Sequence, residues 1–169
     1  MDESSHPINK HLDKHQMEIK RINYEERQLV IDLFNKYRIF YKKPSDIKLA
    51  ETFIAERLRN NESVIFAAFE ENDGEQIPIG FTQLYPKFSS GRAIKIWVLN
   101  DLYVKEGHRK KSVGNKLIET VLEYAQSDGV SVVELSTAVD NYTAQSLYES
   151  IGFVKQGPDT EFLSYQIMI

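Results

Sequence analysis

The spacing of hydrophobic residues in the first third of the chain predicts a strand followed by two helices. Apolar and polar residues alternate over residues 17–22 (MEIKRI), which is typical of a half-buried strand. Apolar residues then recur every three or four positions over about 24–41 and again over 47–58, which is the spacing of amphipathic helices. Asn23 can cap the first helix, and Pro44 prevents it from continuing.

The middle of the chain changes to a period of two, which predicts three consecutive strands. They cover residues 63–70 (SVIFAAFE), 78–86 (PIGFTQLYP) and 93–104 (AIKIWVLNDLYV). The turn-forming segments ENDGEQ and SSGR separate them. The simplest arrangement of such strands is an antiparallel meander.

The last third of the chain returns to the helical period and then alternates helices with strands. The expected elements are a helix at about 113–126, a buried strand at 130–138, a short helix from Asn141 to Gly152, and strands at 153–155 and 162–168. The chain contains no internal repeat and no low-complexity segment.

The predicted element order is β-α-α-β-β-β-α-β-α-β-β, in which the helix between strands 93–104 and 130–138 is the clear crossover. This order predicts an α/β fold with a mostly antiparallel mixed central sheet flanked by helices. We expect a single domain over residues 17–169, preceded by a polar, flexible leader at 1–16. Whether the leader belongs to the natural protein is left open, because Met17 could itself be the first residue.

Composition excludes several classes of function. The chain of 169 residues has 21 basic and 25 acidic side chains and a formal net charge of -4, so no overall field attracts it to nucleic acid or to an anionic membrane. No apolar run approaches the roughly 20 residues that span a bilayer, and the N-terminus lacks the apolar centre of a secretory signal. We therefore expect a cytoplasmic protein. The absence of cysteine excludes disulfides and thiolate catalysis.

Three of the four histidines, His6, His11 and His15, lie in the leader. His11 and His15 are four residues apart and could share a helical face around a metal ion. No nearby apolar pattern would hold such a site rigid, so we prefer a solvated leader and expect no metal.

Residues 108–117 (HRKKSVGNKL) join a predicted strand to a helix and concentrate positive charge there. Amides in the first turn of a helix have no acceptor within it, and the helix dipole adds partial positive charge, so this join is a suitable anion site. Arg109, Lys110 and Lys111 add full charges, and Gly114 permits a close approach to the backbone. The expected ligand is a phosphate or pyrophosphate, and the alternative is a solvated basic loop.

Two common phosphate-binding motifs do not fit this segment. Gly107 and Gly114 have neither the G-x-G-x-x-G spacing of a dinucleotide fold nor the G-x-x-x-x-G-K-[ST] spacing of a nucleoside triphosphatase. No accompanying motif of metal-binding carboxylates is present in the sequence. Both of these classes are therefore excluded.

Two segments resemble the motifs of the GNAT acetyltransferases. The first is similar to that superfamily's acetyl-CoA signature, V-x-x-x-x-R-x-x-G-x-G-x-x-L, and is carried by Val104, Arg109, Ser112, Gly114 and Leu117. The second resembles N-x-x-A-x-x-L-Y-x-x-x-G-F and is carried by Asn141, Ala144, Leu147, Tyr148, Gly152 and Phe153. The expected element order over residues 17–169 is also similar to the GNAT fold.

The resemblance implies that acetyl-CoA is the cosubstrate and assigns residues to it. Backbone groups of Leu102, Tyr103 and Val104 would bind the pantetheine arm as an added strand does. The residues that would hold the pyrophosphate are Arg109, Lys110, Lys111, Ser112, Val113, Gly114, Asn115 and Lys116. Asn141 would face the cofactor. Ser112 departs from the glycine of the motif, and its Cβ restricts the loop.

The implied reaction needs two proton transfers. A primary amine with a pKa of about 10.4 is almost entirely charged at neutral pH, so a base must help to supply the free amine. The resemblance places Tyr148 near the thioester sulfur, where it could protonate the departing thiolate as a general acid; the alternative is an ordinary core aromatic.

Asp101 is the expected base or amine-orienting carboxylate. Similar enzymes with an acidic pair on this strand carry Glu-Asp where this chain has Asn100 and Asp101. Because neighbouring strand residues face opposite sides unless a bulge intervenes, Asp101 could instead belong to a structural network.

The predicted function is acetyl-CoA-dependent N-acetylation of a small cationic primary amine, such as a polyamine, a diamine or an amino acid. Within the superfamily the chain most resembles the polyamine or diamine acetyltransferases and the fungal group that acetylates amines, histone tails or D-amino acids. A protein or peptide amine as acceptor and a non-catalytic acetyl-CoA sensor are the alternatives. Similar enzymes are often paired, so a homodimer is also open.

Overall fold

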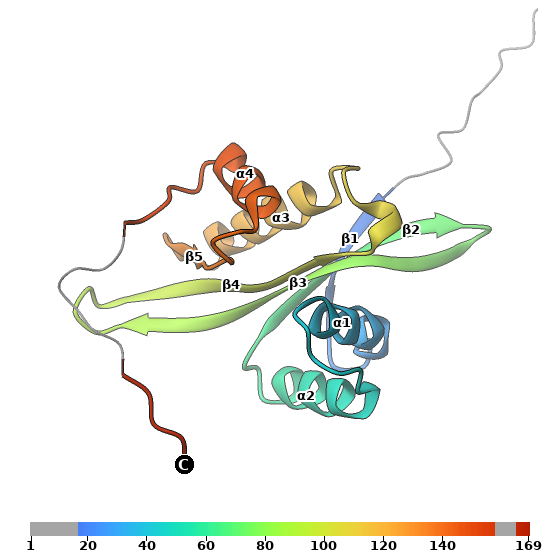
Figure 1. Ribbon diagram of the computed structural model, residues 1–169, viewed down its shortest axis with the longest axis horizontal. Helices are drawn as coiled ribbons and strands as arrows, with labels where there is room; N and C mark the ends of the chain where they lie inside the picture. The colour runs from blue at the N-terminus through green and yellow to red at the C-terminus, as the bar shows by residue number, and fades with distance from the viewer. Residues whose placement is uncertain (1–16, 158–164) are drawn as a thin grey trace, which may run out of the picture. The chain divides into compact units, whose positions relative to one another are not determined.

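The computed structural model describes residues 17–157 and 165–169. The chain divides into two compact units, one ending at Ser136 and the other beginning at Thr137. The described elements of the first unit are β1 (Met17–Ile22), α1 (Gln28–Phe40), α2 (Ile47–Arg59), β2 (Val64–Asn72), β3 (Glu75–Ser89), β4 (Ile94–Val104), the short 3-10 helix η1 (Glu106–His108), α3 (Val113–Ser127) and β5 (Val133–Leu135) (Figure 1). The second unit contains α4 (Tyr142–Ile151).

The strands of the first unit form one mixed sheet in the order β1-β2-β3-β4-β5. Each neighbouring pair from β1 to β4 is antiparallel, whereas β4 and β5 are parallel and are joined through α3. The predicted α/β fold with a mostly antiparallel mixed sheet is confirmed, and so is the order of elements from β1 to α4.

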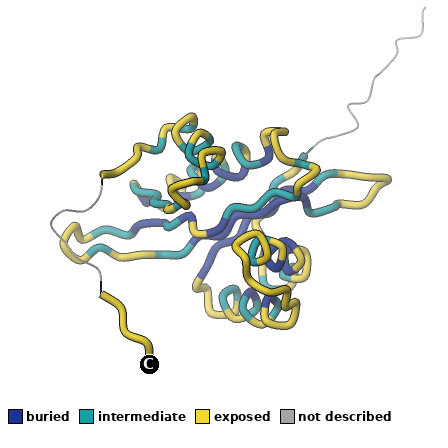
Figure 2. Tube along the Cα trace, viewed as in Figure 1, coloured by how far each residue is buried: buried dark blue, intermediate teal, exposed yellow. Residues whose placement is uncertain are grey.

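Helices cover both faces of this sheet. Figure 1 shows α1 and α2 against one face and α3 against the other. Residues 64–69 of β2 are therefore all buried, as expected for a strand that is covered on both sides (Figure 2). The core between the sheet and the first two helices includes Ile22, Val30, Leu33, Ala50, Ile54, Ile65 and Phe81.

A buried asparagine fixes the connection between α1 and α2. Asn35 is 4% exposed, and its Oδ1 accepts a hydrogen bond from the Asp46 amide at 2.9 Å. Its Nδ2 donates to the Ser45 hydroxyl at 3.0 Å. Asp46 then caps α2 by accepting from the Leu49 amide at 2.9 Å. These bonds set where the end of α1 and the following loop lie over the sheet.

The two predicted strands after α4 require a correction. Residues 153–155 are not a strand, because the Phe153 amide donates to the Tyr148 carbonyl at 3.0 Å and so belongs to the end of α4. Gly152, with φ 111°, gives its amide to the Glu149 carbonyl, which completes a Schellman cap. Of the predicted strand at 162–168, residues 165–168 are not a strand, and 162–164 lie outside the described residues.

Two further predictions concern the ends and the organisation of the chain. The leader at 1–16 and its histidines lie outside the described residues. The assignment of 17–169 to a single domain stays a prediction. Within residues 17–157 and 165–169, no helix is long and apolar enough to cross a membrane.

Candidate active site

The predicted anion site lies at the join between β4 and α3. Lys110 and Ser112 both have φ 61°, so two residues of the loop adopt the left-handed conformation before the helix begins at Val113. The Ser112 side chain makes no capping hydrogen bond, and its carbonyl accepts from the Lys116 amide at 3.1 Å. The amides of residues 113–115, in the first turn, therefore have no acceptor within the helix.

The basic side chains of this loop are not equivalent. Lys110, Lys111 and Lys116 are exposed and can turn towards an anion. Arg109 instead donates from Nε to the Val104 carbonyl at 3.0 Å, which ties the loop to the end of β4. Its guanidinium also lies 5.5 Å from the centre of the Phe40 ring and 5.8 Å from that of Tyr103.

Two other predicted loop residues offer mainly their backbone. The Val113 side chain is 3% exposed and packs in the core, so it presents only its amide to a ligand. Gly114 and Asn115 are half-buried in the first turn of α3.

The end of β4 has a strand neighbour on one side only, within the described residues. Residues 102–104 pair with residues 80–82 of β3, whereas β5 pairs with β4 only at residues 97–99. The far side of Leu102–Val104 is thus open to an added strand or to an extended ligand with amide groups. This is the feature that the predicted pantetheine contacts require.

Gly80 brings this end of the sheet close to the helix, and sequence reasoning missed it. A Cβ at this position would lie 2.9 Å from the Tyr103 carbonyl oxygen, 3.3 Å from the Val113 side chain and 3.4 Å from that of Val104. Only a glycine leaves room for β4 and the start of α3 together. Its position inside a predicted strand was the available signal.

Asp101 lies at a β-bulge in β4. Gln83 of β3 is opposite Asp101 and Leu84 is opposite Leu99, so Asn100 is the additional residue. Asn100 and Asp101 consequently border the same pocket, which neighbouring residues of a regular strand would not do.

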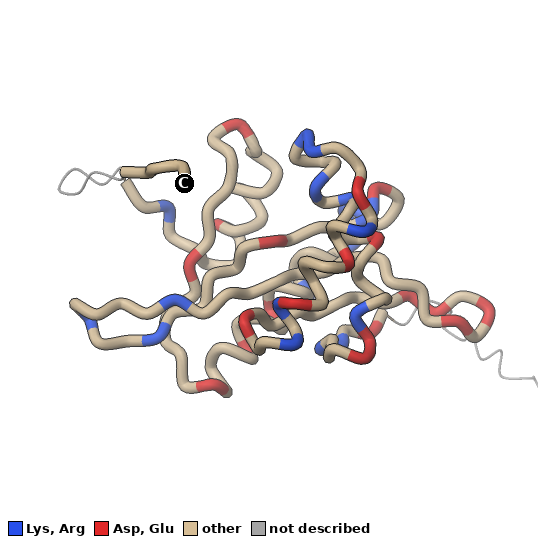
Figure 3. Tube along the Cα trace, turned by 90° about the horizontal axis from the view of Figure 1, so that it is seen from below, with Lys and Arg blue, Asp and Glu red and all other residues tan. Residues whose placement is uncertain are grey.

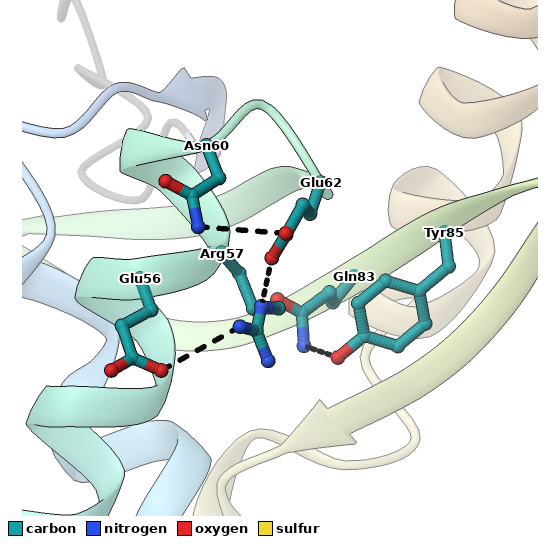
Figure 4. A network of polar contacts seen from close by, with 6 residues as sticks. All are labelled: Glu56, Arg57, Asn60, Glu62, Gln83 and Tyr85. Carbon is teal, nitrogen blue, oxygen red and sulfur yellow. Dashed lines mark hydrogen bonds and ion pairs between the residues drawn. The ribbon is translucent and has the colours of Figure 1, made fainter.

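The Asp101 carboxylate is held by a network of hydrogen bonds. It is 2% exposed, and its Oδ2 accepts from Gln83 Nε2 at 2.7 Å while its Oδ1 accepts from Asn100 Nδ2 at 3.0 Å. The Thr82 hydroxyl donates to the Asp101 carbonyl at 2.9 Å. Gln83 Nε2 also donates to the Tyr85 hydroxyl at 2.8 Å, and Figure 4 shows these two side chains beside each other.

Burial sets the proton affinity of this group. Burial raises the pKa of Asp101, and hydrogen bonds from Gln83, Tyr37 and Asn100 offset part of that effect. Burial, reinforced by the Asp101 charge, also raises the pKa values of Tyr37, Tyr41 and Tyr85. The tyrosines therefore remain neutral, and Asp101 is the ionised group of this cluster, with its pKa raised above the usual range of a carboxyl.

A pocket of about 400 Å³ lies over this carboxylate. Its walls come from α1, α2, β3 and β4 and are mostly aromatic or apolar. The lining residues are Phe34, Tyr37, Arg38, Tyr41, Lys43, Leu49, Phe53, Tyr85, Asn100 and Asp101. A pocket of this size and composition suits a small organic molecule whose polar group meets the carboxylate.

Tyr37 and Tyr85 belong to this site, although sequence reasoning assigned them no role. Tyr37 occupies a hydrophobic stripe of α1, and Tyr85 lies in a predicted strand, so both match the pattern of core residues. No local pattern indicates that both face Asp101, because the bulge that turns Asp101 into the pocket depends on pairing with β3.

The two remaining predicted site residues belong to the second unit. The Asn141 side chain caps α4 by accepting from the Ala144 amide at 3.3 Å. Tyr148 lies in the last turn of α4, is half-buried, and packs edge-on against Phe153 with ring centres 6.0 Å apart. This contact between the last turn and the residue after the glycine is typical of the Schellman cap.

The fold and the loop between β4 and α3 define an acetyltransferase of the GNAT class, and comparisons with known proteins agree. The sequence profile of the acetyltransferase (GNAT) family matches residues 29–153, and the chain belongs to that family. It is 42% identical over 149 residues to the uncharacterized N-acetyltransferase YhfO of Bacillus subtilis (strain 168), covering 88% of this chain and 95% of that protein.

Two other similar proteins extend the comparison. The D-amino-acid N-acetyltransferase HPA3 of Saccharomyces cerevisiae is 30% identical over 136 residues, covering 80% of this chain and 83% of the yeast protein. The crystal structure of a probable acetyltransferase has 39% identity and a TM-score of 0.78, covering 90% of this chain and 97% of that one. The chain is therefore an N-acetyltransferase of a family that uses acetyl-CoA.

Proposed function

We propose that the protein acetylates a primary amine of a small molecule, which binds in the aromatic pocket with its nitrogen at Asp101. The observation that carries this proposal is a buried carboxylate in the lining of a largely apolar pocket. Aromatic faces and a carboxylate together attract an ammonium group. The similarity to a yeast enzyme named for D-amino acids is consistent with a small acceptor.

The residues of this chain divide the chemistry between them. Acetyl-CoA supplies the acetyl group, whose C–S bond breaks as the C–N bond forms. Asp101 accepts one proton from the ammonium group, because its raised pKa brings its proton affinity closer to that of an amine. Tyr148, assigned by the motif that contains it, gives a proton to the sulfur and regains one from the nitrogen through solvent. Asp101 then releases its proton to water.

The cofactor end of the site is assigned to the join between β4 and α3. We propose that the open edge of Leu102–Val104 binds the pantetheine amides. The amides of residues 113–115 and the side chains of Lys110, Lys111 and Lys116 would bind the pyrophosphate. Arg109 would act mainly by holding the loop, since its Nε is occupied by the Val104 carbonyl. Asn141 is proposed to face the cofactor on the basis of its motif alone.

Replacement of Asp101 tests the proposal. A panel of primary amines with acetyl-CoA first identifies an acceptor, and kcat/KM is then measured across pH. We expect Asp101→Asn to lower kcat/KM by about 10²- to 10⁴-fold, the usual contribution of a general base. Its pH profile should move to higher pH, because the amine must then lose its proton to solvent.

Asp32→Asn is the matched control for that experiment. Asp32 is exposed on α1 and pairs with Lys36 at the surface, so its replacement should leave the profile unchanged. An unaltered pH profile for Asp101→Asn would return this carboxylate to a structural role. Tight CoA binding without turnover of any amine would instead indicate a sensor.

A further inference from the structure

The pocket over Asp101 contains two cations that the proposed chemistry does not use. Arg38 and Lys43 both line it, and Asp101 is the one carboxylate among its lining residues. The two cations come from the last turns of α1 and from the loop that follows, which Asn35 holds in place. The described lining therefore carries more positive than negative charge even when Asp101 is ionised.

Neither cation is neutralised by the protein, within residues 17–157 and 165–169. Arg38 Nη1 is buried and has no hydrogen-bond partner there. Lys43 is exposed, and no ion pair joins it or Arg38 to a carboxylate in the described part of the chain. A guanidinium that lines a pocket without an ion pair favours a ligand that supplies an anionic oxygen to its accessible face.

A second ammonium group would meet the opposite conditions. A diamine or polyamine that placed one nitrogen at Asp101 would bring its other charge towards Arg38 and Lys43. Like charges in a partly desolvated pocket repel strongly. The lining thus disfavours the polyamine and diamine acceptors that the family resemblance had suggested.

We infer that Arg38 and Lys43 form a carboxylate-binding subsite, so that the acceptor is a small amino acid with a free carboxylate. This inference rests on the proposed function, in which the amine lies at Asp101. The apolar walls, including Phe34, Phe53 and Leu49, would then contact the side chain of the amino acid. An apolar or aromatic amino acid matches all three parts of the pocket: its amine lies at Asp101, its carboxylate at the two cations, and its side chain against the apolar walls.

Matched pairs of acceptors isolate the carboxylate. Leucine and phenylalanine, as both enantiomers, are compared with leucinamide and phenylalaninamide, which have the same side chains and amines but no carboxylate. A carboxylate stabilises the neighbouring ammonium, so the amides lose a proton more readily and have more free amine near neutral pH. A higher kcat/KM for the acids must therefore come from their recognition by the protein.

We expect at least one acid to exceed its own amide in kcat/KM. Arg38→Gln should lower this acid-to-amide ratio by about tenfold to a hundredfold, as expected when a charge-assisted hydrogen bond is lost. Lys43→Gln, at an exposed position, should lower it in the same direction with little risk to folding. Lys48→Gln removes the same charge from an exposed residue of α2 that does not line the pocket, and should keep the wild-type ratio.

Calorimetry separates failure of this inference from failure of the proposed function. Leucine and leucinamide are titrated into the CoA-loaded protein, which reports binding whether or not any amine is acetylated. Tighter binding of leucine that Arg38→Gln and Lys43→Gln both weaken would support the subsite even without turnover. Equal or tighter binding of the amide, no binding of either compound, or a preference that survives both substitutions would overturn it.

Discussion

At the scale of single residues, the proposed amine site depends on how neighbouring side chains hold the Asp101 carboxylate. Asp101 is almost fully buried, yet hydrogen bonds from Gln83 and Asn100 fix both of its oxygens. Burial raises its pKa, and the hydrogen bonds keep its charged form accessible. A carboxylate in this condition can both attract an ammonium group and accept its proton. Without the bulge at Asn100, the same residue would not share its neighbour's pocket.

Tyr148 carries the complementary prediction at this scale. Its ring packs against Phe153, and Tyr148→Phe keeps that packing while it removes the hydroxyl. If the hydroxyl protonates the departing thiolate, kcat should fall by about 10²- to 10⁴-fold, whereas the KM for acetyl-CoA should change little. Steady-state and single-turnover kinetics together show whether the chemical step has slowed.

Tyr142→Phe is the control for this substitution. Tyr142 lies on the same helix, is 72% exposed, and loses the same hydroxyl. It should behave as the wild type. A Tyr148→Phe enzyme with wild-type kcat, under conditions where chemistry limits turnover, would leave Tyr148 as a packing residue of α4.

At the scale of elements, the proposed cofactor end of the site depends on how closely β3, β4 and α3 approach one another. Gly80 lies opposite Val104 in the sheet and close to the side chain of Val113, the first residue of α3. The left-handed conformations of Lys110 and Ser112 then bring the chain into the helix. Ser112 replaces the glycine of the motif, and a Cβ in this conformation costs about 1 to 2 kcal/mol. The loop is formed nonetheless, so the departure is tolerated.

Gly80→Ala tests this close approach. The added methyl group would lie 2.9 Å from the backbone oxygen of Tyr103, so β4 must shift at the edge that we assign to pantetheine. Overpacking of this kind costs about 1 to 3 kcal/mol of the free energy of unfolding. We expect a loss of that size in urea denaturation and a weaker affinity for CoA in calorimetry.

A second glycine provides the comparison. Gly91, in the turn between β3 and β4, has open space where a Cβ would be, so Gly91→Ala should leave both stability and CoA affinity nearly unchanged. Equal behaviour of the two variants would show that the approach of β4 to β3 does not limit the cofactor site.

The sequence predicts elements well where their signals are local. The alternating runs and the Asp73–Gly74 dipeptide predict the hairpin of β2 and β3, where these residues have φ 50° and 83°. Sequence patterns fail where hydrogen bonds between backbone segments decide the local structure. The segment after Gly152, predicted as a strand, is not one at 153–155, because the Phe153 amide donates to the Tyr148 carbonyl and closes α4. The bulge at Asn100 likewise depends on register with β3, which no local pattern encodes.

At the scale of the whole molecule, charge is distributed rather than separated. The formal net charge is -4, and Figure 3 shows acidic and basic positions interspersed along the chain. Many of these charges pair at the surface, as Arg57 does with Glu62 and Glu56 in Figure 4. Such exposed pairs contribute little to stability. The binding of a strongly anionic cosubstrate therefore depends on where the cations lie locally rather than on the net charge of the whole protein.

Charge reversal at two loop lysines separates the local effect from the global one. Lys110→Glu with Lys111→Glu changes the formal charge from -4 to -8, because each replacement contributes -2. Lys42→Glu with Lys48→Glu makes the same change of charge elsewhere, and all four lysines are exposed. The two pairs also match in backbone conformation, since each includes one residue with a positive φ, Lys110 at 61° and Lys42 at 62°. The overall repulsion of CoA is thus equal in the two variants.

If residues at the start of α3 bind the pyrophosphate, only the loop variant loses affinity beyond that shared repulsion. We expect its dissociation constant for CoA to exceed that of the control by about tenfold or more, since charge-assisted contacts are lost. The excess should shrink as salt is added, because exposed charges are screened. Urea denaturation should give both variants nearly wild-type stability. Equal CoA affinities for the two variants at low salt would mean that these lysines face solvent and that the pyrophosphate binds elsewhere.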